Sequence, residues 1–262
     1  LAAAPDQDPV RRYALFVLGD VALYEGHLDE AVRRYDQAAH FARAAGDSYT
    51  HAFAVVNAAL PLAYRSDDVD AVAAARKARS VAVMTNSPYV VGWADYTLGE
   101  ALSDVDPDQA IIAIDAALSA ALSTRNRFLQ GIALVSAASL RTRHDDPHVA
   151  LGLFGQVIDH WQRAGNWTQQ WITLRNVTCL LARLGADESA AILCGALDGR
   201  RTAAPLFGAD ADRLASTSAE LCARLGERRH RDLLARGAEM TDDDAVMFVA
   251  AEIDRAARRH SR

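Results

Sequence analysis

Small and apolar residues recur along the chain at intervals of about 40 residues. The small residues that open the five repeated segments are Ala31, Ala71, Ala110, Ala150 and Ala190. Their spacings are 40, 39, 40 and 40 positions. In each segment further apolar residues follow four and seven positions later, as Tyr35 and Ala38 follow Ala31. Spacing of i, i+4 and i+7 places the three residues on one buried helix face.

Each repeated segment follows a turn, and each turn follows another apolar segment. The first example, GHLDEAVRRYDQAA (26–39), begins with a glycine and acidic residues that suit a turn and the first turn of a helix. Two helices of about 17 residues and two short turns fill a 40-residue unit. A single helical hairpin leaves an apolar face uncovered, so the pattern predicts an array of stacked hairpins.

Composition agrees with an all-α fold. Of the 262 residues 51% are hydrophobic, while Gly (15) and Pro (7) are scarce, which favours long helices over sheets. We expect a helical repeat array over residues 1–200 and capping helices over 201–262, where the period is lost. In the second part a loop is predicted over 200–210, Gly226 is expected to end a helix and Thr241 to be the N-cap of the last one.

The repeat resembles the tetratricopeptide repeat. Leu18-Gly19, Ala31, Tyr35 and Ala38 match its Leu-Gly pair and its small, aromatic and small positions, and Leu98-Gly99 repeats the pair. The period differs from the usual 34 residues, and three of the units lack the Leu-Gly pair. The resemblance covers about residues 9 to 200 and implies a right-handed α-solenoid of about five hairpins.

The last third is similar to the C-terminal region of large actinobacterial regulators. The stretches LRNVTCLLARLGADESAAILCGALDG (174–199) and MTDDDAV (240–246) carry this resemblance. In those LuxR-type proteins, and in relatives linked to a nucleotide cyclase, a signalling ATPase module of the STAND type precedes a tetratricopeptide-like arm. The chain begins without Met, and we therefore expect it to be a piece of a longer protein. Three widely separated cysteines, Cys179, Cys194 and Cys222, favour reduced thiols and hence a cytoplasmic protein.

No catalytic motif is apparent. The single lysine, Lys77, has no glycine-rich loop before it, so no P-loop is expected, and ATPase or cyclase activity would belong to another part of the polypeptide. The net charge of −6 argues against direct nucleic-acid binding, and no membrane span is expected. His144-Asp145-Asp146-Pro147-His148 and Glu227 with His230 contain metal-ligand residue types, but a helix start and a solvated helix are favoured. We expect no metal and no cofactor.

Two groups of residues are candidates for binding a ligand or partner. Trp161, Trp167 and Trp171 lie within eleven residues and form either the packed junction of units four and five or an aromatic platform. A polar stripe on the first helices contains four further residues, which are Asn57, Ser136, Arg175 and Asn176. These side chains either bind a ligand or hydrogen-bond neighbouring helices.

The sequence therefore predicts a non-catalytic sensor or protein-interaction arm. It would bind a protein, a small effector or the rest of its own polypeptide on the concave face formed by the first helices. The alternatives are a scaffold that associates with itself, for example as a homodimer, and an enzyme with a dispersed helical site. Light scattering distinguishes the scaffold, whereas an aromatic-lined pocket with perturbed acids would favour the enzyme.

Overall fold

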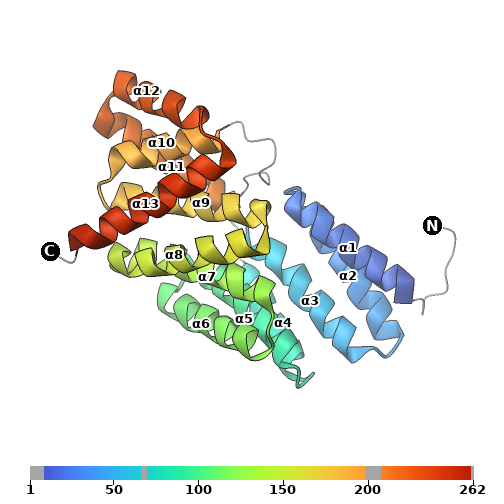
Figure 1. Cartoon of the computed structure of the whole chain (residues 1–262). Coiled ribbons are helices and arrows are strands. Elements are labelled where there is room, and N and C mark those ends of the chain that lie inside the picture. The colour runs from blue at the N-terminus through green and yellow to red at the C-terminus, as the bar shows by residue number, and fades with distance from the viewer. Residues whose placement is uncertain (1–8, 66–69, 199–207, 261–262) are drawn as a thin grey trace. The chain divides into compact units, whose positions relative to one another are not determined.

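The computed structural model describes residues 9–65, 70–198 and 208–260 (Figure 1). These residues form thirteen α-helices and contain no strand, which confirms the all-α prediction for the described chain. The helices are α1 (Pro9–Tyr24), α2 (Leu28–Ala44), α3 (Ser48–Ala63), α4 (Ala71–Val83), α5 (Pro88–Leu102), α6 (Pro107–Ser123), α7 (Arg127–His144), α8 (Pro147–Ala164), α9 (Trp167–Arg183), α10 (Asp187–Leu197), α11 (Gly208–Leu225), α12 (Glu227–Ala238) and α13 (Asp242–His260). Most of the predicted loop at 200–210 and the turn at 66–69 lie outside the described residues.

Side-chain caps explain where many of the helices begin. Asp47, Ser87, Asp106 and Asn166 each accept a hydrogen bond from the backbone N–H three residues later. Proline occupies the first position of α5, α6 and α8, where its missing N–H leaves no helical hydrogen bond unmade. Thr241 caps α13 as predicted, because its hydroxyl accepts from the N–H of Asp244.

The helices belong to two compact units. The first contains α1 to α6 and the beginning of α7, up to Ala133. The second contains the rest of α7, helices α8 to α10, nearly all of α11, and α12 and α13. Each unit is described by itself.

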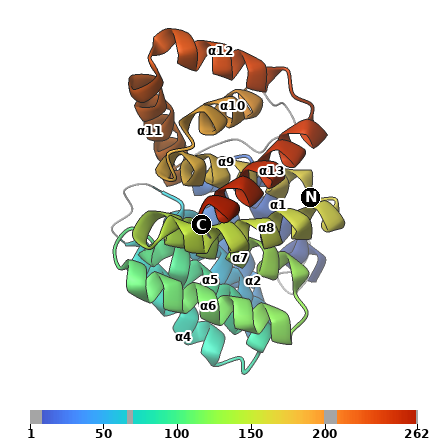
Figure 2. The same cartoon turned by 60° about the vertical axis from the view of Figure 1, so that its left-hand side comes forward.

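In the first unit each helix packs against its neighbours in the chain. Helix α2 lies between α1 and α3, α4 lies between α3 and α5, and α3 also contacts α5 (Figures 1 and 2). Helix α6 completes a close pair with α5. The first helices α3 and α5 are therefore neighbours, and the second helix α4 packs against both.

The repeated alanines occupy equivalent places in the first two pairs. Ala31 of α2 packs with Ala22 of α1 and Ala58 of α3. Forty residues later Ala71 of α4 packs with Leu62 of α3 and Leu98 of α5. Ala31 is fully buried and Ala71 is 5% exposed. The small residue thus contacts the first helix of its own pair and that of the next pair.

The Leu-Gly positions mark a second equivalent contact. A Cβ added to Gly19 would lie 2.6 Å from the ring of Tyr35, and one added to Gly99 would lie 2.6 Å from the side chain of Ile114. Tyr35 and Ile114 both follow the repeated small residue by four positions and are fully buried. Glycine therefore makes room for the larger residue of the facing helix in the first and third pairs.

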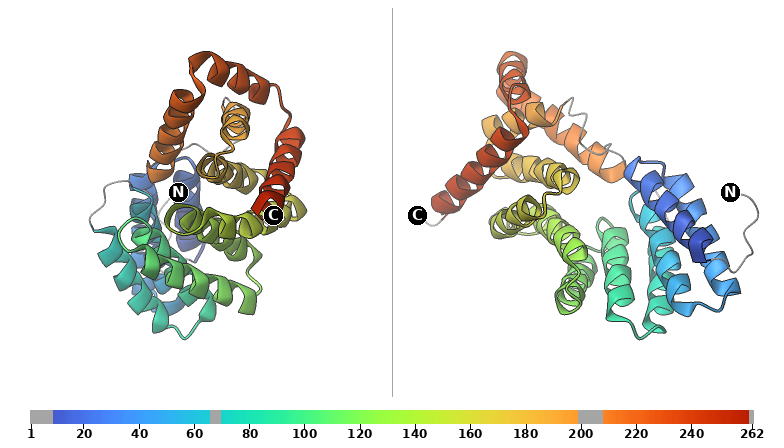
Figure 3. Two further views of the ribbon diagram at one scale, coloured as in Figure 1. Left: turned by 90° about the vertical axis from the view of Figure 1, so that its left-hand side faces the viewer. Right: turned by 45° about the vertical axis from the view of Figure 1, so that its right-hand side comes forward.

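In the second unit the three C-terminal helices contact helices that come earlier in the chain. Helices α12 and α13 both pack against α10, and α13 also contacts α8 and α9 (Figure 3). Arg224 of α11 forms two hydrogen bonds with Asp187 at the start of α10, each 2.9 Å long. Arg229 of α12 pairs with the neighbouring Glu188. These bonds join α11 and α12 to the acidic first turn of α10.

Candidate protein-binding face

Four aromatic side chains form a continuous row across the first helices of the first unit. We call this row the aromatic ladder; its members are Phe16 of α1, Phe53 of α3, Trp93 of α5 and Phe128 of α7. Ring centroids are 5.1 Å apart for Phe16 and Phe53, 6.1 Å for Phe53 and Trp93, and 6.2 Å for Trp93 and Phe128. These distances lie within the range of favourable aromatic pairs. The ladder therefore joins four successive first helices.

All four rings of the ladder are half-buried. Tyr35 packs edge-on against Phe16, Tyr89 packs against Phe53, and Tyr96 packs edge-on against Trp93. The indole N–H of Trp93 is covered from solvent and has no acceptor among the described residues. The ladder is thus a rigid, partly exposed apolar surface, which is a feature of many binding surfaces.

A polar residue follows three of the ladder rings by one helical turn. Asp20 accepts a 2.6 Å hydrogen bond from the hydroxyl of Tyr35, and burial raises the pKa of this carboxyl group. The amide nitrogen of Asn57 donates to the carbonyl of Phe53 at 2.8 Å, and the hydroxyl of Thr97 donates to the carbonyl of Trp93 at 3.0 Å. Of these three residues, Asn57 belongs to the predicted polar stripe, whereas Asp20 and Thr97 were not predicted.

Asn57 and Asn176 show the same hydrogen bond in different units. The amide nitrogen of Asn176 donates to the carbonyl of Ile172 at 3.0 Å, four residues earlier, as Asn57 does to Phe53. Asn57 is buried and Asn176 is half-buried. Both bonds lie within one helix, so in each case the amide donor is bound to the residue's own helix and not to a neighbouring one.

The predicted tryptophan cluster is divided between core and surface. Trp161 of α8 is 2% exposed and Trp171 of α9 is fully buried, whereas Trp167 at the start of α9 is 40% exposed. His160 packs edge-on against Trp161, with ring centroids 4.7 Å apart. Only Trp167 therefore presents substantial surface to a ligand in this structure.

Arg175 and Ser136 complete the predicted set. Arg175 lies on α9 one turn after Trp171, is half-buried, and has a pKa lowered by that burial, which the nearby charge of Asp210 opposes. Ser136 is half-buried on α7. Asn57 belongs to the first unit and the other six predicted residues to the second.

The sequence analysis did not find the aromatic ladder. Phe16, Phe53, Trp93 and Phe128 precede the repeated small residue of their units by 15, 18, 17 and 22 positions. An alignment in strict register therefore never places them in one column. The available signal was weaker: every one of the first four units has an aromatic residue in its first helix.

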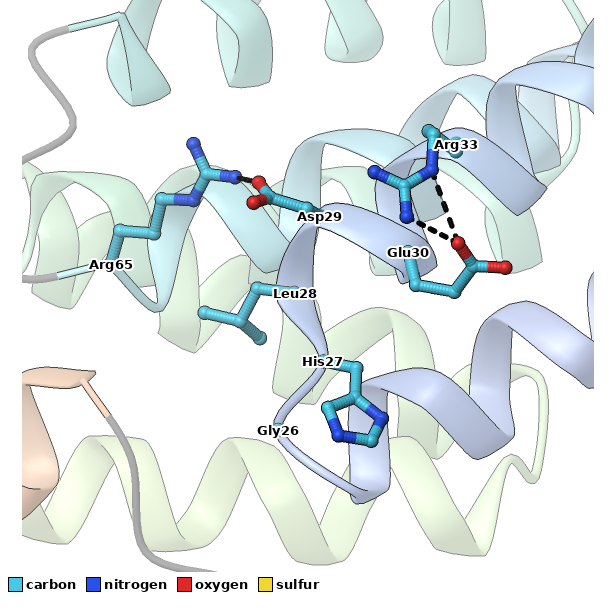
Figure 4. Close-up of a pocket in the computed structure, with 7 residues that line it drawn as sticks. All are labelled: Gly26, His27, Leu28, Asp29, Glu30, Arg33 and Arg65. Carbon is cyan, nitrogen blue, oxygen red and sulfur yellow. Dashed lines mark hydrogen bonds and ion pairs between the residues drawn. The ribbon is translucent and has the colours of Figure 1, made fainter.

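A polar pocket opens at the turn between α1 and α2 (Figure 4). It has a volume of about 670 Å³ and is lined by Gly26, His27, Leu28, Asp29, Glu30, Arg33 and Arg65. Arg65 forms an ion pair with Asp29, and Arg33 forms one with Glu30. Because opposite charges in the pocket pair with one another, it has no excess of one sign that would select an ionic ligand.

Helix α1 carries an exposed apolar row in addition to its ladder residue. Tyr13 is 73% exposed, Val17 39%, Val21 47% and Tyr24 39%. Their spacing places them along one side of α1. Such a contiguous apolar face is typical of an interaction surface.

Comparison with known proteins identifies no family. No family model matches the chain, and no curated protein matches it. Among the described residues, no helix has the length and apolar character needed to span a bilayer.

Proposed function

We propose that the chain is a non-catalytic protein-interaction module built from tetratricopeptide-like hairpins, arranged as a right-handed α-solenoid. It binds an extended peptide segment of a partner protein across the aromatic ladder. The observation that carries this proposal is the continuous row of half-buried rings on α1, α3, α5 and α7. Aromatic side chains contribute large contact area at low conformational cost, so they are common among the residues that dominate binding energy.

The equivalent packing of Ala31 and Ala71 supports the repeat part of the proposal. Both residues pack with side chains of two consecutive first helices. A surface assembled from successive first helices is long enough to contact several side chains of an extended peptide.

The resemblance to actinobacterial regulators suggests the biological setting. In this proposal the module is the arm of a larger cytoplasmic LuxR-type or cyclase-linked regulator, and any ATPase or cyclase activity belongs to another part of that polypeptide. Binding on the ladder would favour one of two arrangements of the regulator that already exchange.

A random peptide library displayed on phage tests the binding proposal. We expect the wild-type chain to enrich a consensus peptide rich in apolar residues. A Phe53→Leu variant keeps an apolar side chain but removes a ring from the ladder. The synthetic consensus peptide should therefore bind this variant about tenfold more weakly, which is a loss of about 1.4 kcal/mol in binding free energy. Isothermal titration calorimetry measures both affinities.

Phe41→Leu is the matched control for this experiment. Phe41 is also half-buried but lies on the second helix α2, where it packs with the core and under the guanidinium of Arg11. Its replacement should leave peptide affinity unchanged. The proposal is wrong if no peptide is enriched, or if both variants bind the consensus peptide as the wild type does.

The exposed row on α1 favours a second candidate function, which is self-association. Two copies that pair along Tyr13, Val17, Val21 and Tyr24 would cover this surface. We expect sedimentation velocity to show a dimer whose fraction rises with concentration, and a Val17→Ser/Val21→Ser variant to be monomeric. Val83→Ser, which changes an exposed valine on α4, should leave the dimer intact. A wild-type chain that stays monomeric at every concentration excludes this function.

A further inference from the structure

We propose that Asp146, His148 and His260 form a binding site for a divalent transition-metal ion, with Zn²⁺ as the best match. One potential ligand atom from each of the three residues lies within 4.8 Å of the other two. All three belong to the second unit. The site joins the start of α8 to the end of α13.

Two of the residues are held in place by the start of α8. Asp146 caps the helix, and one of its carboxylate oxygens accepts from the backbone N–H of His148 at 2.9 Å. The same oxygen lies 2.8 Å from the Nδ1 atom of the His148 ring. The carboxylate and the imidazole are therefore neighbours before any metal arrives.

The third residue comes from a distant part of the sequence. Helix α13 packs against α8 (Figures 1 and 2). Its last residue, His260, stacks its ring on that of His148. The two ring centroids are 3.9 Å apart and the ring planes differ by 18°. The packing of α13 on α8 does not depend on the Asp146 cap. It places a second imidazole, that of His260, beside the His148 ring.

The set of donors selects the class of metal. Two imidazole nitrogens and one carboxylate suit Zn²⁺ and similar ions, whereas Mg²⁺ and Ca²⁺ require mostly oxygen ligands. Ligand atoms in a tetrahedral zinc site are about 3.3 Å apart, given bonds of about 2.0–2.1 Å. Metal binding would require the exposed His260 side chain and the half-buried His148 side chain to rotate to that spacing. Water would occupy the fourth position.

The three cysteines are the competing ligands in this unit. Burial raises the pKa of the Cys179 thiol and raises that of Cys194 to about 12, so both remain protonated near neutral pH. A metal ion requires the thiolate form. At neutral pH the His/Asp cluster therefore has the advantage over these two thiols.

Titration of the whole chain with Co²⁺ and Zn²⁺, after treatment with a chelator, tests the site. We expect one equivalent of Co²⁺ to give a tetrahedral absorption spectrum without a thiolate charge-transfer band, and Zn²⁺ to displace it. Because α13 is attached to α8 through the metal, saturating Zn²⁺ should also raise the melting temperature.

Substitution of each proposed metal ligand distinguishes binding at this site from unspecific binding elsewhere on the protein. His148→Ala and His260→Ala should weaken Zn²⁺ binding by more than about tenfold, the lower end of the loss seen when only outer-shell partners are changed. Asp146→Asn keeps a good N-cap and should weaken binding similarly, through loss of the charge. His27→Ala is the control, because His27 also lies beside a carboxylate, that of Glu25, but belongs to no such cluster of ligand atoms among the described residues.

Four results would overturn the proposal. The first is no stoichiometric uptake of Co²⁺ or Zn²⁺, and the second is a spectrum with a thiolate band. The third is uptake that His260→Ala leaves unchanged while circular dichroism shows the variant to be folded. Binding that is lost equally in the His27→Ala variant would also contradict it.

Discussion

A Gly237→Ala variant is expected to lose more than about 3 kcal/mol in the free energy of unfolding. Gly237 of α12 is buried against α10, where an added Cβ would overlap the carbonyl oxygen of Ile192 and lie 2.7 Å from the nitrogen of Ala196. Gly195 of α10 faces the backbone of Leu234 in the same way. These atoms belong to helix backbones and cannot rotate aside, so the loss should exceed the usual range for overpacked cores.

Urea unfolding followed by circular dichroism and tryptophan fluorescence measures this loss. Gly155→Ala is the matched control, since Gly155 is an exposed position of α8 with no atom within 4 Å of an added Cβ. Alanine is the better helix former, so the control should gain up to about 1 kcal/mol. A Gly237→Ala variant as stable as the wild type would show that α12 does not dock closely on α10.

A Trp171→Ala variant is expected to lose about 3–5 kcal/mol, the range for a large aromatic side chain removed from a core. Trp171 is fully buried on α9, so its loss leaves a cavity. Trp167→Ala, on the same helix, should cost less than about 1 kcal/mol because the side chain is 40% exposed. The same urea titrations measure both variants. Equal, small costs would mean that Trp171 does not belong to the core and would favour the platform interpretation of the tryptophan cluster.

The sequence predicted the helices because local and repeated signals agree. The 40-residue spacing of Ala31, Ala71 and their equivalents marks the second helix of each pair, and the structure places a helix start at or just before each of them. Capping residues such as Asp106 and Thr241 fix several starts independently. These signals depend on residues close together in the chain, where a sequence pattern is most informative.

The contacts between distant segments were not predictable in the same way. His148 and His260 are brought together only by the packing of α13 on α8, and the C-terminal helices do not repeat. Gly195 and Gly237 carry no visible signal of a close helix contact, because glycine in a helix is equally compatible with an exposed position such as Gly155. The ladder residues precede the repeated small residue by different numbers of positions. An alignment of the repeats therefore did not distinguish Trp93 from other apolar residues.

The tryptophans allow the central claim, that partners bind on the aromatic ladder, to be tested directly. The chain has four, and Trp93 is the one in the ladder, while Trp161, Trp167 and Trp171 belong to the second unit. Fluorine NMR of the 5-fluorotryptophan-labelled chain, titrated with the consensus peptide from the phage library, reports on each one after assignment with Trp→Phe variants. We predict that the Trp93 resonance shifts and the other three do not. A peptide that binds but moves only the resonances of Trp161, Trp167 or Trp171 would contradict the account.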